Sequence, residues 1–303
     1  MIQFNPADFR PNFAGPGDRR FWGKNPEFGA AVSYYLRQPA KAIKLTVEDA
    51  RAALVREISS ESLTDRTGPG IHRTYWDLRY QPLPRPRIAP TGGGGGGGGT
   101  LNGPFVLPGD YRVTLSVDGK TVGSRSIHVN GDPIIRITDA DRKTLHSTAL
   151  ALHELQQTAD EAASAVSALS EQMIAVQDLM KTGTAPASVK ATVDDLSKRI
   201  AGFRRPLAVW GQPPALGGFG GDPPLRNQIA NLKAQIMAST SVPTEVQMRL
   251  AREVREDLAK MVGEINSVIT AGMPALYRVL TENNLQPGLT PIKAVNPAPT
   301  QGM

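Results

Sequence analysis

The sequence predicts an α+β protein with two domains: an antiparallel β-sandwich followed by an antiparallel bundle of helices that includes one long helix. Two observations support this prediction. Between residues 30 and 130 apolar side chains recur at every second position, as in half-buried strands, whereas after residue 138 they recur every three to four positions, as on one helix face. The length of 303 residues allows two cores of ordinary size.

Short strand-like runs separated by turn signals predict the β-sandwich over residues 21–133. In DYRVTLSV (110–117) the apolar residues alternate with polar ones, Asp118-Gly119 is typical of a hairpin turn, and 122–129 returns as the partner strand. About six or seven strands at this spacing are typical of the immunoglobulin or fibronectin type of sandwich. The other expected strands are 30–36, 42–47, 53–59 and 73–80.

We place the helical bundle at 138–285. A stripe of apolar residues predicts that it begins with one long helix. Thr138 followed by Asp141 is typical of a helix start, and Gly183 of a helix stop. Such a helix would be roughly 63 Å long and needs partners to bury its stripe. The stripe consists of Leu145, Thr148, Leu152, Leu155, Ala159, Ala162, Val166, Leu169, Met173, Val176 and Met180.

Three further stripes predict the partner helices, and short links between them favour a four-helix arrangement with antiparallel neighbours. Pro274 is expected to bend or restart the last helix. The stripes are Val189, Val193, Leu196, Ile200 and Phe203; Leu225, Ile229, Leu232 and Ile236; and Val246, Leu250, Val254, Leu258, Met261, Ile265 and Val268.

Four segments fall outside these patterns. Residues 1–20 are polar and are expected to form a linker, and 286–303 a loose tail. The eight glycines at 92–99 predict a surface loop, because no helix start with Lys and Ser or Thr follows as a phosphate-binding loop requires. The long loop 204–224 carries Trp210 and Phe219, which either pin it to the bundle or present it to a partner.

Charge and composition limit the function classes. The formal charge is +6, but the basic residues are scattered, so a nucleic-acid surface is not expected. The absence of cysteine excludes disulfides, a thiol nucleophile and cysteine metal sites. No apolar run approaches the ~20 residues that span a bilayer, and no signal peptide is recognisable at the start.

The stretch GPGIHRTYWDLRY (68–80) has the densest group of polar and aromatic side chains. Period-two alternation predicts a strand that turns Trp76 and Leu78 into the core, while Asp77 faces away toward loop backbone or an arginine. His146 and His153 are seven residues apart, too far to share a metal, and are interpreted as solvated residues flanking the stripe.

No catalytic constellation is recognisable elsewhere. A GxSxG motif is absent, and acidic residues such as Asp194, Asp195, Glu253 and Asp257 are expected on solvated helix faces. A pair of glycosidase carboxylates cannot be identified from sequence. We therefore predict no catalytic, cofactor-binding or metal-binding residue.

The segment FWGKNPEFGAAVSYYL (21–36) resembles the segment that follows the β-propeller in large exported bacterial proteins of the sortilin-type or BNR-repeat, glycosyl-hydrolase-like class. The matching positions are Gly23, Asn25, Pro26, Gly29, Ala30, Tyr34, Tyr35 and Leu36. The resemblance continues through WDLRY (76–80), GPFVLPGDYRVTL (103–115) and MPALYRVLTENNL (273–285), and so covers about residues 20–290. The first half is also similar to the Ig-like module of flagellar hook-capping proteins, which are not enzymes.

The propeller for which the resembled class is named is missing, because the chain has no repeat of roughly 40–50 residues. The resemblance therefore implies a detached C-terminal module, whose setting would be the periplasm or the cell exterior, and no catalytic residue carries over. The favoured function is a non-catalytic structural or protein-interaction module, with a protein partner or the missing propeller as its contact. The alternative is a carbohydrate-binding or glycosyl-hydrolase accessory unit in which Trp22, Tyr34 and Tyr35 stack on sugar rings. We favour packing in the core or at the edge of the sandwich for these three residues, because they lie in strand-like alternation or at a strand entrance.

Overall fold

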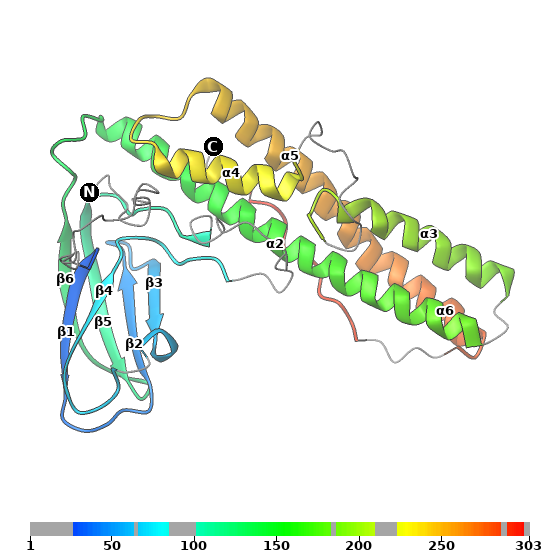
Figure 1. The fold of residues 1–303 in the computed structure, drawn as a ribbon, viewed down its shortest axis with the longest axis horizontal. Coiled ribbons are helices and arrows are strands. Elements are labelled where there is room, and N and C mark those ends of the chain that lie inside the picture. The colour runs from blue at the N-terminus through cyan, green and yellow to red at the C-terminus, as the bar shows by residue number, and fades with distance from the viewer. Residues whose placement is uncertain are drawn as a thin grey trace, which may run out of the picture. The chain divides into compact units, whose positions relative to one another are not determined.

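The computed structural model describes residues 27–63, 66–84, 101–182, 186–209, 223–285 and 290–299. Within these residues the chain is a mixed α+β protein with strands in two antiparallel sheets and a set of long helices (Figure 1). It forms two compact units. The β unit takes its residues from Met1–Pro82, Asn102–His146 and Thr240–Val242, and the helical unit from Leu83–Leu101, Ser147–Ser239 and Pro243–Met303.

The β unit contains the expected strands. A two-stranded sheet pairs β1 with β4, and a four-stranded sheet has the order β3-β2-β5-β6. The β5–β6 hairpin turns at Asp118 and Gly119, both at positive φ, as the Asp-Gly signal predicts. The bounds are β1 Ala30–Leu36, β2 Ile43–Glu48, β3 Leu54–Ser59, β4 Gly70–Trp76, β5 Gly109–Val117 and β6 Lys120–Val129.

Residues from both sheets and from the short 3-10 helix η1 (Ser60–Leu63) form one hydrophobic core. Alternation places every second side chain of each inner strand in this core, which is the arrangement that period-two patterning predicts. The most completely buried aromatic residue is Trp76, at 0% exposure. The other core residues include Tyr34, Leu36, Ile43, Leu45, Val47, Val55, Ile58, Leu63, Val106, Tyr111, Val113 and Val129.

The strand in the motif 68–80 spans 70–76 and so ends before the expected residue 80. β4 stops at Trp76, and Leu78 has φ 56°, a left-handed conformation that breaks the alternation. Leu78 and Tyr80 still pack against the core, although both lie in irregular backbone. A single bridge between Arg79 and Phe105 replaces the expected strand continuation.

Two glycines allow backbone segments to approach this corner closely. A Cβ on Gly29 would overlap the carbonyl oxygen of Trp76, and a Cβ on Gly103 would overlap that of Tyr80. Gly29 also has φ 118°, which side-chain-bearing residues rarely adopt. Both positions therefore require glycine.

The helical unit is built on the long helix α2 (Asp139–Thr182), which is continuous over 44 residues. Thr138 caps its start, because its Oγ1 accepts from the Asp141 backbone N–H at 3.1 Å. The helices that follow are α3 (Ala187–Arg204), α4 (Leu225–Ala238), α5 (Glu245–Ser267) and α6 (Met273–Glu282), with a π-helical turn, η2 (Val268–Gly272), between the last two.

Side-chain contacts give the direction of each helix relative to α2. On α4, Arg226 and Lys233 meet Asp160 and His153 respectively, so α4 is antiparallel to α2. The path α5–η2–α6 is parallel to α2, since Met248 contacts Thr148 and Tyr277 contacts Gln172: two pairs whose numbers rise together. α3 contacts the end of α2 through Ser197 and Gln177.

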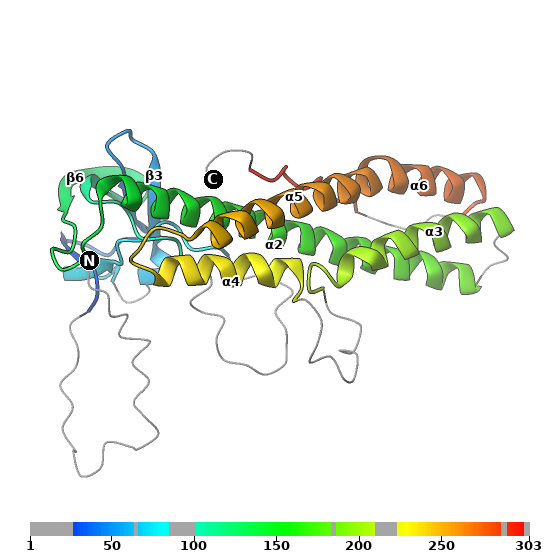
Figure 2. The ribbon, with the colours of Figure 1, turned by 90° about the horizontal axis from the view of Figure 1, so that it is seen from above.

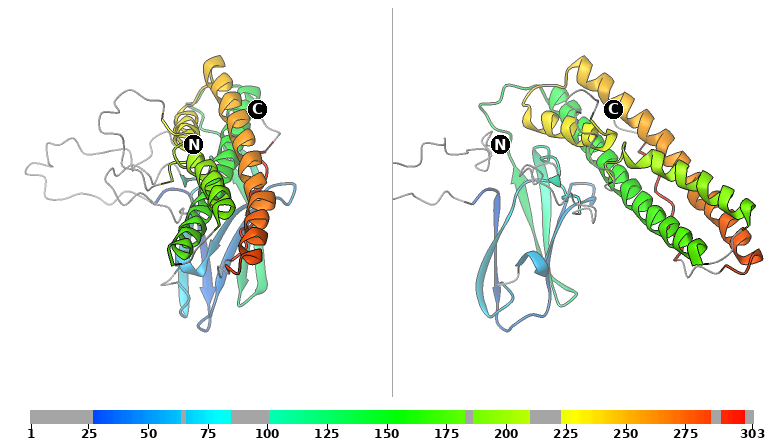
Figure 3. Two further views of the ribbon diagram at one scale, coloured as in Figure 1. Left: turned by 90° about the vertical axis from the view of Figure 1, so that its right-hand side faces the viewer. Right: turned by 45° about the vertical axis from the view of Figure 1, so that its right-hand side comes forward.

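α3 and α4 therefore share one return path, which differs from the expected four-helix arrangement (Figures 2 and 3). At about 66 Å, α2 is longer than either α3 at about 27 Å or α4 at about 21 Å, so two short helices are needed to cover it. α4 packs beside α5, and α3 beside α6. Each level of the unit contains three helices.

The expected stripes of α3 and α4 are buried, and so is that of α2 except at its two ends, where Leu145 and Met180 are half-buried. Leu152, Leu155, Val166 and Leu169 are at 0% exposure. The stripe of α5 was wrong in its first turns. Val246 is 53% exposed and Leu250 38%, because the face toward α2 is formed there by Met248 and the buried Ala251 instead. From Val254 onward the expected stripe is largely buried.

Pro274 does restart the last helix, and the π-helical turn shows how. Proline has no N–H to donate to the carbonyl four residues earlier, so the helix rearranges just before it. The N–H of Met273 bonds to the carbonyl of Val268, five residues back. The chain thereby continues from α5 into α6 without a loop.

Residues 290–299 are held against the helices, although we expected a loose tail over 286–303. The side-chain amide of Asn266 on α5 donates to the Val295 carbonyl at 2.9 Å and accepts from the Val295 N–H at 2.8 Å. Val295 and Ala298 are buried. Among the described residues, the helices are too short or too polar to cross a bilayer.

Candidate functional site

The polar residues of the motif 68–80 bond to the backbone around them. Nε1 of the buried Trp76 donates to the Arg79 carbonyl at 3.0 Å, and its ring meets Tyr111 edge-on at 5.3 Å. Nε2 of His72 donates to the Gly68 carbonyl at 2.7 Å. Oδ1 of Asp77 accepts from the Arg79 N–H at 3.3 Å, as its expected role next to loop backbone requires. These bonds hold the strand and its exit in place.

Arg79 and Tyr111 complete this structural network. The Arg79 guanidinium donates to the Gly103 carbonyl at 3.1 Å and lies 3.5 Å from the centre of the Phe105 ring. The Tyr111 hydroxyl donates to the Leu107 carbonyl at 2.7 Å. Burial, with smaller contributions from Tyr80 and Asp49, raises the pKa of Tyr111 to about 12, so this hydroxyl keeps its proton.

The outward face of the β1–β4 sheet has a different character. We call it the β1–β4 outer face; it consists of Ala31, Ser33, Tyr35, Ile71, Arg73 and Tyr75. Tyr35 is 65% exposed and lies directly opposite Ile71, which is 81% exposed. Nε of Arg73 donates to the Ser33 hydroxyl at 3.2 Å, and within the described residues Arg73 has no carboxylate partner.

The predicted interaction residues separate in the structure. Tyr34 is 7% exposed and its hydroxyl donates to the Arg66 carbonyl at 3.0 Å, so it belongs to the core. Its neighbour Tyr35 points outward, because successive strand residues face opposite sides. Trp22, Trp210 and Phe219 lie outside the described residues, as does the poly-glycine loop.

The interpretation of His146 and His153 as solvated flank residues was wrong. His153 is 7% exposed, and its Nδ1 lies 3.3 Å from Nζ of Lys233, itself 0% exposed. The Nε2 atom of His146 is buried. His153 is buried by α4, and His146 is half-buried by the Tyr80 ring.

A buried polar cluster therefore connects α2 to α4. The Arg226 guanidinium donates to the Asp160 carboxylate at 2.6 Å, and both side chains are 13% exposed. Burial raises the pKa of Asp160 more than the charges of Arg226 and Lys233 lower it. His153 with Lys233 and Asp160 with Arg226 thus form two facing pairs in the helical core.

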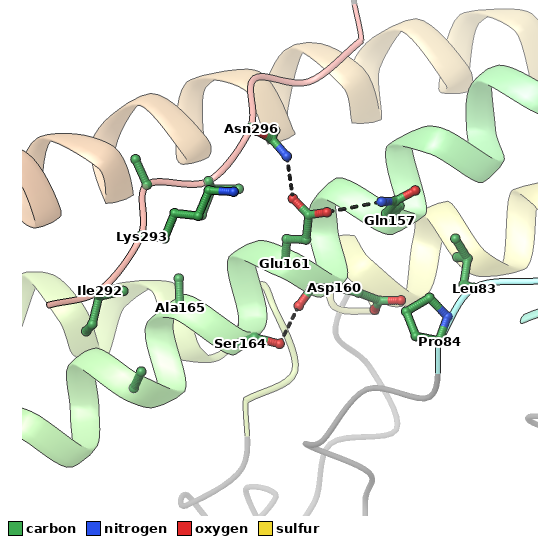
Figure 4. Close-up of a pocket in the computed structure, with 13 residues that line it drawn as sticks. Leu83, Pro84, Gln157, Asp160, Glu161, Ser164, Ala165, Ile292, Lys293 and Asn296 are labelled. Carbon is green, nitrogen blue, oxygen red and sulfur yellow. Dashed lines mark hydrogen bonds between the residues drawn. The ribbon is translucent and has the colours of Figure 1, made fainter. Parts of the chain in front are cut away.

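A groove of about 450 Å³ in the helical unit lies beside this cluster (Figure 4). Its walls are Leu83 and Pro84, the α2 face from Gln157 to Ala168, and the segment from Ile292 to Asn296. The Glu161 carboxylate accepts from the Gln157 amide at 3.1 Å and from the Asn296 amide at 3.2 Å. Of the two groove carboxylates, Glu161 is thus engaged through both oxygens, whereas Asp160 is engaged through Oδ1 and its Oδ2 is buried without a hydrogen-bond partner among the described residues.

Comparison with known proteins adds no relative. No protein-family model, curated protein or solved structure matches the chain. In the part of the chain that the structure describes, no group of three or more His, Asp or Glu side chains is arranged to hold a metal ion.

The sequence reasoning missed the α2–α4 cluster, although a signal for it exists. His153 and Asp160 are seven residues apart on α2, and Arg226 and Lys233 are seven apart on α4. A seven-residue spacing returns to the same helix face, so two such pairs on antiparallel helices can face each other. Lys233 also continues the spacing of Ile229 and Ile236, which places it on the core side.

Proposed function

We propose that the chain is a non-catalytic structural or protein-interaction module, built from an Ig-like β-sandwich and a helical bundle. Two sheets with a shared core, and the bond from the Tyr111 hydroxyl to a carbonyl four residues upstream, support the Ig-like interpretation. The internal bonds of His72, Trp76 and Asp77 support a structural role for the motif that most resembled a site.

The observation that carries the interaction proposal is the exposed Tyr35–Ile71 pair. Tyrosine, arginine and apolar side chains gathered at one place are typical of the energetically important centre of protein interfaces. The β1–β4 outer face has two tyrosines, an isoleucine and Arg73, and none of its six residues is acidic. We infer that its partner is a protein surface that offers a carboxylate for Arg73 beside an apolar patch.

The resemblance to the segment after the propeller of exported sortilin-type or BNR-repeat proteins supports the same function, with a propeller as one partner of this kind. Gly29 and Gly103, the two positions where the fold requires glycine, both lie inside the segments that carry this resemblance, which supports it. A carbohydrate-binding accessory unit is the second candidate. The exposed Tyr35 ring favours it, because an outward-facing ring is available for stacking on a sugar.

Site-specific photo-crosslinking tests the protein-interaction proposal. A photoreactive phenylalanine replaces Tyr35 in the protein produced in its own cells, and the control carries it at Val122 on β6, which is 59% exposed in the same unit. We expect a defined protein crosslink from position 35 that decreases when Arg73→Glu is added. Equal crosslinking from both positions, or none from position 35, would contradict the proposal.

A polysaccharide pull-down and a glycan array with the purified chain separate the two candidates. The protein-interaction proposal predicts no specific glycan retention. Reproducible retention that disappears in Tyr35→Ala, with an unchanged circular dichroism spectrum, would replace it by the carbohydrate-binding function.

A further inference from the structure

His146 lies on the first turns of α2, within the β unit. Its ring centre is 5.4 Å from that of Tyr80, which follows the motif strand β4. Its Nε2 is buried and has no hydrogen-bond partner among the described residues. The ring thus attaches the start of α2 to the β unit by packing, and one of its nitrogens is left unsatisfied.

This environment suits a neutral imidazole and not a charged one. A protonated imidazole has two N–H donors, each of which needs an acceptor or water, and a buried charge without them is costly. Burial accordingly lowers the pKa of His146 below its ordinary 6.5. Protonation is therefore favoured only when the ring leaves its site.

The charged groups near this contact do not compensate. Arg142 lies one turn earlier on α2, and Arg56 on β3 donates to the Tyr80 carbonyl at 3.4 Å while its guanidinium lies 4.0 Å from the Asp77 carboxylate. The negative charge of Asp49 acts on the Tyr80 hydroxyl. The lowering of the His146 pKa has burial as its cause.

The other histidines of the β unit differ. Nε2 of His72 bonds to the Gly68 carbonyl, and Nδ1 of His128 lies 2.7 Å from the Asp110 carboxylate on the exposed surface of β5 and β6. Neither combines burial with an unsatisfied ring nitrogen. Within the β unit, acid sensitivity of this kind is thus confined to His146 among the described histidines.

We propose that His146 is a pH-sensitive latch: its protonation releases the first turns of α2 from Tyr80 and so from the rest of the β unit. The attachment weakens at low pH because the pKa of His146 is lower in the attached state than in the released one. The released state binds the proton more tightly, so the attachment is fully stable above pH 6.5 and weakens as pH falls from there toward the lower pKa of the folded state. Across that window the fraction released rises about tenfold per pH unit.

Hydrogen exchange of the full chain between pH 7.5 and 4.5, corrected for the intrinsic exchange rate, tests the latch. Peptides covering 139–150 and 76–84 should open about tenfold more for each pH unit below about 6.5 in the wild type. In His146→Phe, which keeps an aromatic ring but cannot be protonated, the opening should not depend on pH. His128→Gln is the matched control and should behave as the wild type does.

Two outcomes would overturn the proposal: an opening of these peptides that stays constant in the wild type, or the same rise in His146→Phe. If that variant does not fold, His146→Leu replaces it. An NMR titration of His146 in the wild type gives an independent readout, and a pKa at or above 6.5 would also contradict the latch.

Discussion

Replacement of Trp76 by phenylalanine tests whether the motif 68–80 is structural. Trp76 is fully buried, donates one hydrogen bond to the Arg79 carbonyl and contacts the Tyr111 ring. Loss of the hydrogen bond should cost about 1 kcal/mol. The smaller ring leaves a cavity that should cost a further ~1–2 kcal/mol, a fraction of the ~3–5 kcal/mol measured for removal of a whole buried aromatic ring. We therefore expect the β unit to lose about 2–3 kcal/mol of unfolding free energy.

Native-state hydrogen exchange of peptides from β4 and β5 measures this change in the full chain, because it reports the β unit separately from the helical unit. Tyr75→Phe is the matched control, since Tyr75 neighbours Trp76 but faces outward. It should change the unfolding free energy by less than about 0.5 kcal/mol. A loss in Trp76→Phe no larger than that of the control would refute the structural interpretation.

Two further predictions concern backbone approach and the buried cluster. Gly103→Ala places a methyl group against the Tyr80 carbonyl and should destabilise the β unit by about 1–3 kcal/mol. The control Gly123→Ala, whose Cβ meets nothing within 4 Å, should not destabilise it. Hydrogen exchange of β-unit peptides measures the unfolding free energy of both variants. Arg226→Met leaves the Asp160 carboxylate buried without its partner and should destabilise the helical unit by about 3 kcal/mol, measured by urea unfolding. Adding Asp160→Leu should restore most of that loss, and a double variant as unstable as the single one would contradict the ion-pair reasoning.

The elements were predictable because their periodicities are strong. Alternation in 111–117 and the three-four spacing from Leu145 to Met180 both follow directly from burial on one face. The end of β4 was not predictable, since Leu78 adopts a left-handed backbone conformation without the glycine or asparagine that usually signals one.

The errors within the helical unit have one common cause. A stripe identifies which face of a helix is buried but not how many neighbours cover it. His153 and Asp160 lie beside the stripe of α2, where α4 covers them, and the stripe gives no sign of this second contact. On α5 the opposite happened: Val246 and Leu250 fit the spacing, yet the first turns present Ala251 to the interior.

Because α3 and α4 lie one after the other along α2, the two ends of the helical unit are held together by different contacts. α4 is tied to α2 by two pairs of polar side chains, whereas α3 lies against α6 across Gly272, where a Cβ would come within 2.9 Å of Leu196. The two ends also meet, because the Arg226 N–H of α4 bonds to the carbonyl of Pro206 just after α3 at 3.2 Å. Polar pairs thus hold α2 at one end of the unit, and close backbone approach holds the other end.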